Sequence, residues 1–258
     1  MILLASAFIA LAGFLPPSQA QEILKSAGSF AVLGGTAVTS IGNTVLTGNL
    51  GVSPGATITG FGPGIVISGT TYAGGSVADA AQADVLWAYN LLAGEAVTQD
   101  LTGKDLGGLT NTPGVYYFNA AAQLTGILTL DAQGDSNARF DFRIGSTLTT
   151  ASGSSIVLLN GAQAGNVYWQ VGSSATIGLG TAFDGNILAN ASITMNTGAS
   201  MSGRALAISG AVTLDDNAIT IPVGVPEPES FWLLIFSGSV FGVWRWWVGR
   251  RRKAGHSQ

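Results

Sequence analysis

Two stretches of the chain carry the same alternation of apolar and small polar residues. Residues 176–189 align without a gap with residues 194–207, eighteen positions later, and a third, shorter copy begins at Thr213. Thr176, Thr194 and Thr213 share one column of this alignment, and Ile177 and its two apolar equivalents share the next. Alternation with period two is typical of strands with one buried face, and a repeat of this length predicts turns that stack. The pattern therefore predicts a mainly β protein built as a β-solenoid.

Other short apolar runs, separated by glycines, have the length of strands. Each is bounded by residues that favour turns. The runs lie at residues 30–33, 44–46, 64–67, 114–118, 126–130, 139–144, 155–159 and 166–171.

One segment has a different pattern. Residues 76–93 are rich in alanine, contain neither glycine nor proline, and end at Gly94. We predict one long α-helix there, of about five turns. Ala80, Ala83, Trp87 and Leu91 follow a helical spacing, so they are the positions we expect to dock on the solenoid.

Composition narrows the functional class. The 258 residues include 37 glycines, only 9% charged residues and no cysteine, and the formal net charge is −4. A sparsely charged, acidic chain is not suited to binding nucleic acid, which is itself negatively charged. With no disulfide, residues 21–221 must be held by core packing, and a segment of this length can form a single domain.

Both ends carry hydrophobic segments. Residues 1–20 resemble a secretory signal peptide with a cleavage site after Ala20, although a retained anchor is the alternative. A proline-rich linker is expected at 222–230, a transmembrane helix at 231–249 and a basic cytoplasmic tail at 250–258. A buried core helix is the alternative for the second apolar segment.

The three-part C-terminal order resembles the PEP-CTERM sorting signal. That resemblance implies export, transient anchoring in the inner membrane of a Gram-negative bacterium, and processing by an exosortase-type enzyme, after which the protein is extracellular or at the cell surface. It also implies exopolysaccharide as a partner. The residues that carry it are Val225, Pro226, Glu227 and Pro228 before the apolar segment, and Arg250, Arg251, Arg252 and Lys253 after it.

Catalytic side chains are scarce. The only histidine is His256, in the tail, so Ser-His or Cys-His catalysis and histidine metal sites are excluded from residues 21–221. Asp131 and Asp135, like Asp215 and Asp216, suit either a calcium loop or an ordinary tight turn. We expect no enzyme, no metal and no cofactor.

Six motifs of the predicted domain are long enough to be specific. They are SAGSFAVL at 26–33, TGNLGVSPG at 47–55, LTGILTLDAQG at 124–134, IGSTLTTASG at 144–153, NGAQAGNVYWQVG at 160–172 and GNILA at 185–189. These motifs resemble the DUF3494 ice-binding proteins, and the resemblance covers essentially all of residues 21–221. It implies a right-handed β-solenoid of triangular cross-section, one α-helix packed alongside, and ice binding through one flat face.

Outward threonines that recur once per turn would stand about 4.8 Å apart along the stack. Such an array can hold ordered water and join an ice crystal at little further ordering cost. Alternatively, exposed threonine is simply a good strand former. The candidate ice-contacting residues are Thr176, Thr194 and Thr213; a second column in which Ala182 aligns with Ser200 and Asp184 with Ser202; Thr147 and Thr149; and Thr36 and Thr39, which fit a pattern typical of ice-binding faces in the family.

Two functions follow as hypotheses. The first is an exported protein that binds ice or inhibits ice recrystallisation, with the ordered water of the ice surface as its partner. The alternative is a structural or adhesive component of an exopolysaccharide or biofilm matrix, which rests on the sorting signal.

Overall fold

The computed structural model describes residues 23–222. The signal peptide at 1–20, the linker beyond Pro222, the transmembrane segment at 231–249 and the basic tail all lie outside the described residues. Within residues 23–222, no helix is long and apolar enough to cross a membrane.

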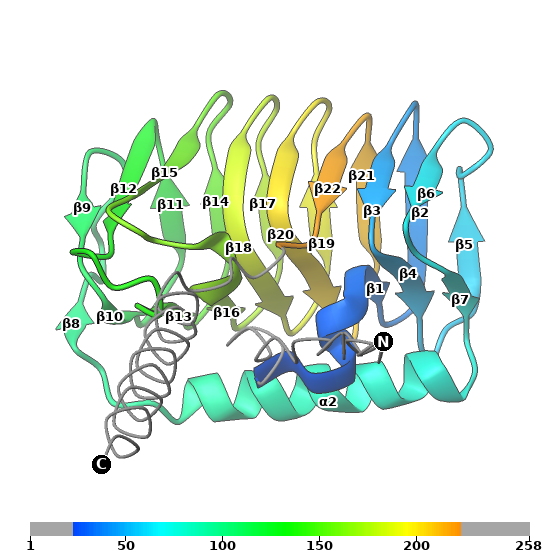
Figure 1. Cartoon of the computed structure of the whole chain (residues 1–258), viewed down its shortest axis with the longest axis horizontal. Helices are drawn as coiled ribbons and strands as arrows, with labels where there is room; N and C mark the ends of the chain where they lie inside the picture. The colour runs from blue at the N-terminus through cyan, green and yellow to red at the C-terminus, as the bar shows by residue number, and fades with distance from the viewer. Residues whose placement is uncertain (1–22, 223–258) are drawn as a thin grey trace, which may run out of the picture. The chain divides into compact units, whose positions relative to one another are not determined.

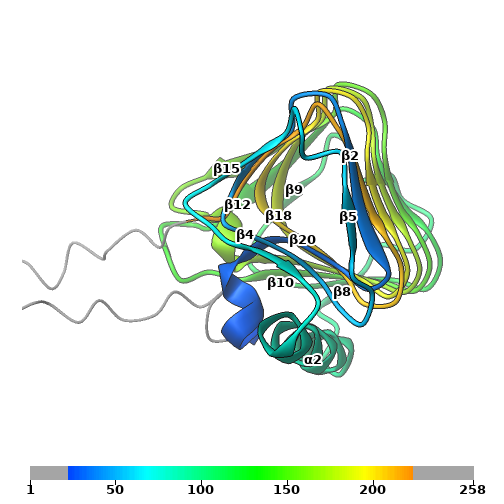
Figure 2. The same ribbon diagram turned by 90° about the vertical axis from the view of Figure 1, so that its right-hand side faces the viewer.

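The described residues form a mainly β unit with parallel strands and one long α-helix (Figure 1). Viewed along the stack, the strands enclose three sides of a triangle (Figure 2). One side is a separate seven-stranded sheet. Its strands, in spatial order, are β11 (Ala122–Leu124), β14 (Leu148–Thr150), β17 (Ala175–Ile177), β19 (Ile193–Met195), β21 (Val212–Asp215), β2 (Ala37–Ile41) and β5 (Thr57–Thr59).

A fifteen-stranded sheet forms the other two sides and bends around the corner between them. The side that carries the helix consists of β8 (Gln99–Asp100), β10 (Gly114–Phe118), β13 (Phe140–Ile144), β16 (Val167–Val171), the second halves of β18 (Ala182–Ala189) and β20 (Ser200–Ala207), β1 (Phe30–Gly34), β4 (Asn49–Val52) and β7 (Thr71–Ala73). The remaining side, called the third side below, consists of β9 (Thr110–Asn111), β12 (Ile127–Asp131), β15 (Ser155–Leu159), the first halves of β18 and β20, β22 (Ala218–Thr220), β3 (Val45–Thr47) and β6 (Ile65–Ile67). Two short 3₁₀-helices, η1 (Lys25–Ser29) and η2 (Ala164–Asn166), precede β1 and β16.

Glycine makes the bend inside β18 and β20 possible. Gly185 and Gly203 are paired across these strands and have φ angles of 115° and 158°. A Cβ on Gly203 would lie only 1.8 Å from the carbonyl oxygen of Gly185. The corner therefore requires a residue without a side chain.

The eighteen-residue register predicted from the repeat is confirmed. Ala182 pairs with Ser200 and Ala189 with Ala207, while Thr176 pairs with Thr194. All eight apolar runs form strands whose bounds lie within one residue of those expected.

The order of the stack does not follow the order of the sequence. Strand β2 pairs with β21, so the beginning of the chain stacks against its end. From there β1 to β7 continue to one end of the stack, α2 (Ser76–Ala93) runs back along it, and β8 to β22 return (Figure 1).

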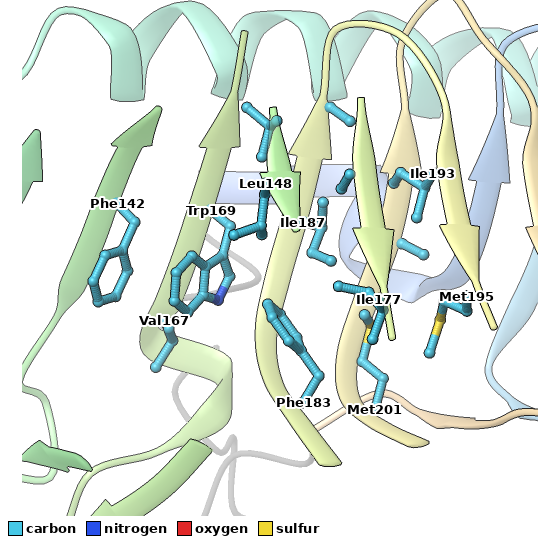
Figure 3. Close-up of a cluster of buried hydrophobic side chains, with 14 of the residues drawn as sticks. Phe142, Leu148, Val167, Trp169, Ile177, Phe183, Ile187, Ile193, Met195 and Met201 are labelled. Carbon is cyan, nitrogen blue, oxygen red and sulfur yellow. The ribbon is translucent and has the colours of Figure 1, made fainter. Parts of the chain in front are cut away.

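Inward side chains from the three sides fill the interior. Phe142 and Trp169 stack with their ring centroids 3.9 Å apart, and Phe183 packs against Trp169 at 5.1 Å. Leu148 and Ile193 of the seven-stranded sheet belong to the same buried cluster (Figure 3). This dense filling gives the seven-stranded sheet a rigid support.

Helix α2 has the predicted bounds, but the predicted docking positions were wrong. Ala80, Ala83, Trp87 and Leu91 are all exposed. The residues that pack against the sheet are Ala78, Ala81, Val85, Ala88 and Leu92. Both sets have spacings of three and four residues, so the pattern alone was ambiguous. The face that docks has three alanines, which let the helix axis approach the sheet closely.

Candidate functional site

The seven-stranded sheet carries an unbroken outward column, called here the threonine column. Each member pairs with its neighbour in the adjacent strand. The residues on either side of each member in β14, β17 and β19 are buried, so the member itself points outward. In spatial order the column is Gln123, Thr149, Thr176, Thr194, Thr213, Thr39 and Thr59.

A second column of small residues runs beside the first, two residues earlier in the chain; Ala37 and Thr57 begin their strands, and the other members directly precede theirs. Ala37 pairs directly with Thr57, and backbone hydrogen bonds link the others from strand to strand: Leu148 N donates to Ser174 O and Ala175 N to Ser192 O, at 3.1 and 2.9 Å. The members are Ala121, Thr147, Ser174, Ser192, Ala211, Ala37 and Thr57.

Together the two columns form a surface that we call the threonine face. Seven strands at the usual spacing of about 4.8 Å make it about 29 Å long. It contains no ionisable side chain. Thr39 Oγ1 donates a long hydrogen bond of 3.4 Å to Thr213 Oγ1, so the hydroxyl array continues across the junction between the two ends of the chain. The surface is regular, uncharged and made of methyl and hydroxyl groups.

A charge borders one edge of this face. Asp215 lies two positions beyond Thr213 and pairs with Ile41, whose side chain is 67% exposed. The Thr197 hydroxyl donates to the Asp215 carboxylate. The lattice of small side chains therefore ends at this edge.

Six of the predicted site residues lie together in these two columns: Thr147, Thr149, Thr176, Thr194, Thr213 and Thr39. Thr36 lies just before β2, where its backbone N–H bonds to Gly210 O across the corner. Sequence reasoning missed Gln123, Thr59 and most of the second column. The signal for that column is the small residue two positions before each threonine.

Ala182, Ser200 and Ser202 lie on the third side, away from the threonine face. There the column that contains Ala182 and Ser200 ends at Ile65, and the column that contains Ser202 ends at Ile67. Burial raises the pKa of Asp184, the neighbour of Ser202, to about 6. Bulky aliphatic residues and a carboxyl group make this side uneven.

The loop that resembles a calcium site is built as turns. Asp131 Oδ1 accepts hydrogen bonds from Gln133 N and Asn160 Nδ2, both at 2.8 Å. Asp135 Oδ1 accepts one from Asn137 N at 2.9 Å. These hydrogen bonds show that Asp131 and Asp135 stabilise tight turns, as aspartate often does. Within residues 23–222, no group of three or more acidic or histidine side chains is arranged to hold a metal ion.

Two carboxylates from distant segments meet near the end of α2. Glu95, just after the helix, and Asp141 of β13 both bind the Arg139 guanidinium; Arg139 Nε donates to Asp141 Oδ2 at 2.7 Å. Arg143 donates to the Glu95 carbonyl oxygen. Asp141 is only 3% exposed, so this cluster joins the end of α2 to the sheet and presents no open reactive group.

The described residues form a three-sided parallel stack with one docked helix and one flat, hydroxyl-lined side. This architecture suits a protein that binds an extended surface. The chain belongs to the Ice-binding-like family, whose model matches residues 32–220.

Individual relatives agree with this assignment. The chain is 54% identical to an ice-binding protein of Nostoc sp. strain HG1, over 91% of this chain and 90% of that protein. It is 34% identical to an ice-binding protein of Flavobacterium frigoris strain PS1, over 76% of this chain and 75% of that one. The crystal structure of an ice-binding protein from the Antarctic ascomycete Antarctomyces psychrotrophicus superposes with a TM-score of 0.74, at 41% identity, over 77% of this chain and 97% of that one.

Proposed function

We propose that this protein binds ice through the threonine face. The observation that carries the proposal is the unbroken column of six threonines and one glutamine, one residue per strand. Membership of the Ice-binding-like family and the names of the relatives support the same function. We further propose that the three-sided stack is a right-handed β-solenoid.

The mechanism depends on regularity. Hydroxyl groups at strand spacing hold water by hydrogen bonds, and the methyl groups between them limit where that water can lie. The rigid core holds the threonine side chains in place before the protein binds ice. Binding therefore requires little further ordering of these side chains. The absence of ionisable groups in the two columns means that no charge has to be dehydrated at the ice surface.

The test is a matched pair of substitutions. Thr194→Tyr places a large ring in the middle of the threonine column, whereas Thr220→Tyr places the same ring on the exposed third side. We expect Thr194→Tyr to lose most of the thermal hysteresis and recrystallisation inhibition, and Thr220→Tyr to keep both. Each variant should change the free energy of unfolding by no more than about 0.5 kcal/mol, since both sites are at the surface.

Two outcomes would contradict the proposal. Wild-type activity no higher than that of bovine albumin would reject ice binding. Loss of activity in Thr220→Tyr, with Thr194→Tyr unaffected, would move the binding surface to the third side.

For location, we propose that the protein is exported and held in the inner membrane by residues 231–249 until an exosortase-type enzyme processes it. The support is the sequence of the two ends, which lie outside the described residues. The alternative hypothesis, a component of an exopolysaccharide or biofilm matrix, rests only on the sorting signal at the C-terminal end.

A further inference from the structure

The solvent-facing surface of α2 carries an apolar strip. Val77, Trp87 and Leu91 are 48%, 44% and 41% exposed, and Ala80 and Ala83 are exposed between them. Spacings of three and four residues place these side chains along one strip of the helix surface. A continuous exposed apolar strip that contains tryptophan is typical of a contact surface.

The charged groups beside this strip are already paired. The only charged residues of α2 are Asp79 and Asp84. Ser53 Oγ donates to Asp79 Oδ1 at 2.5 Å, and Ser26 donates to Asp84 Oδ2 from both its backbone N–H and its hydroxyl. No unpaired carboxylate of α2 would therefore have to be dehydrated if the strip were covered.

A lysine stands at the edge of the strip. The Lys25 ammonium lies 3.5 Å from the centroid of the Trp87 ring and 3.9 Å from Asp84 Oδ1. Lys25 begins η1, so the strip runs along the side of α2 that borders η1. Tryptophan with an adjacent lysine is a combination favoured at the interface between lipid and water.

The chain leaves the described unit near η1. Ile221 N donates to Thr47 O at 3.1 Å, and the methyl groups of Ile221 and Ala31 both border Gly48. Ala31 is the second residue after η1. Nine residues, 222–230, separate this point from the apolar segment 231–249. Nine extended residues reach at most about 30 Å.

This exit lies opposite the threonine face. Gly48 connects β3 of the third side to β4 of the helix side, which is the corner that Gly185 and Gly203 form in β18 and β20. The seven-stranded sheet, with β2 and β5, is the remaining side of the triangle and faces this corner across the section (Figure 2). A chain held at this corner therefore presents the threonine face outward.

We propose that, in the membrane-attached form, the strip of Val77, Ala80, Ala83, Trp87 and Leu91 lies in the headgroup region of a phospholipid bilayer and the threonine face points away from it. The inference rests on the proposed function and on the proposed membrane attachment. The partner is a lipid surface because the strip is apolar, is edged by a lysine, and lies near the exit of a chain whose next apolar segment has the length of a membrane span.

The chain lacks cysteine, which allows two matched single-cysteine variants. Ala83→Cys reports on the strip, and Ala121→Cys reports on an exposed position of the threonine face. The full chain, labelled with bimane, is reconstituted into vesicles of phosphatidylethanolamine and phosphatidylglycerol that contain lipids with a nitroxide near the headgroup. We expect quenching at position 83 to be several-fold stronger than at position 121. Adding Trp87→Ser and Leu91→Ser should remove most of the difference.

Other outcomes overturn the proposal. These are equal quenching at the two positions, failure of the full chain to float with the vesicles, or protection of position 83 that depends on protein concentration, which would indicate a second copy instead of lipid. Ice activity measured on the unlabelled chain and on the chain labelled at position 83 separates the two proposals, since position 121 itself lies on the threonine face. Activity without quenching at position 83 rejects only the lipid contact, and quenching without activity in the unlabelled chain rejects only ice binding.

Discussion

Among single residues, Asp141 is the group whose protonation is most closely tied to folding. Burial, and then the facing carboxylate of Glu95, raise the pKa of Asp141 to about 7, although Arg139 acts in the opposite direction. Burial also opposes ionisation of Glu95, but hydrogen bonds with Asp141 and Arg139 lower its pKa overall. The two carboxyl groups thus share one proton beside one guanidinium near neutral pH.

This arrangement predicts that stability falls as the pH rises from the acidic range toward neutral. A carboxyl whose pKa is higher in the folded state stabilises the fold below its ordinary pKa, and the contribution is lost as pH rises through about 7. We expect the Tm of the wild type to fall between pH 5 and pH 8, and to fall less in Asp141→Asn. Burial raises the pKa of Asp184 to about 6, but Asp184 is present in both proteins, so their difference reports on the coupled pair of Asp141 and Glu95. Identical pH profiles from scanning calorimetry would show that Asp141 does not titrate as described.

Among the elements, α2 shows which features of a helix its sequence pattern predicts and which it does not. Its alanine-rich composition, the lack of glycine and proline within it, and Gly94 at its end predicted its bounds correctly, since these are local properties. Its docking face was predicted wrongly, because Trp87 and Leu91 are more apolar than the alanines that make contact. Close approach to the sheet depends on small size at Ala78, Ala81 and Ala88, which no hydropathy pattern records.

Neighbouring leucines of α2 give a direct test of the face. Leu92 is fully buried against the sheet, whereas Leu91 is 41% exposed. Leu92→Ala should lower the free energy of unfolding by about 2–5 kcal/mol, through lost burial and a cavity. Leu91→Ala should cost no more than about 0.5 kcal/mol, as at other surface sites. Chemical denaturation of both variants measures the difference, and equal costs would mean that α2 is docked in another register.

At the scale of the whole molecule, the junction between the two ends of the chain determines the length of the threonine face. Strands β2 and β5 extend a column that would otherwise end at Thr213. Helix α2, with 18 residues, is about 27 Å long, which nearly equals the roughly 29 Å of seven stacked strands. The helix therefore returns the chain to the far end of the stack in one straight element.

This order of strands predicts a distinctive pattern of hydrogen exchange. Because β2 lies between β21 and β5, its amides should be protected about as well as those of β19, and β5 and β11 at the two ends should exchange first. Mass spectrometry of peptides covering residues 37–41, 57–59, 122–124 and 193–195 measures this. Exchange of β2 as fast as that of β5 would instead indicate that the N-terminal strands do not join the stack.

Local features of the sequence determined the elements of this protein and much of its candidate site. Period-two alternation identified the strands. The repeat, eighteen residues from Thr176 to Thr194 and nineteen from Thr194 to Thr213, placed these threonines in one column, because the same pattern recurs in each turn. Only the tertiary structure decided that Ala182, Ser200 and Ser202 belong to another side, since the corners between sides depend on where φ becomes positive at residues such as Gly185. It also decided that Thr39 and Thr59 complete the column, because pairing between the two ends of the chain is a long-range contact that no local pattern encodes.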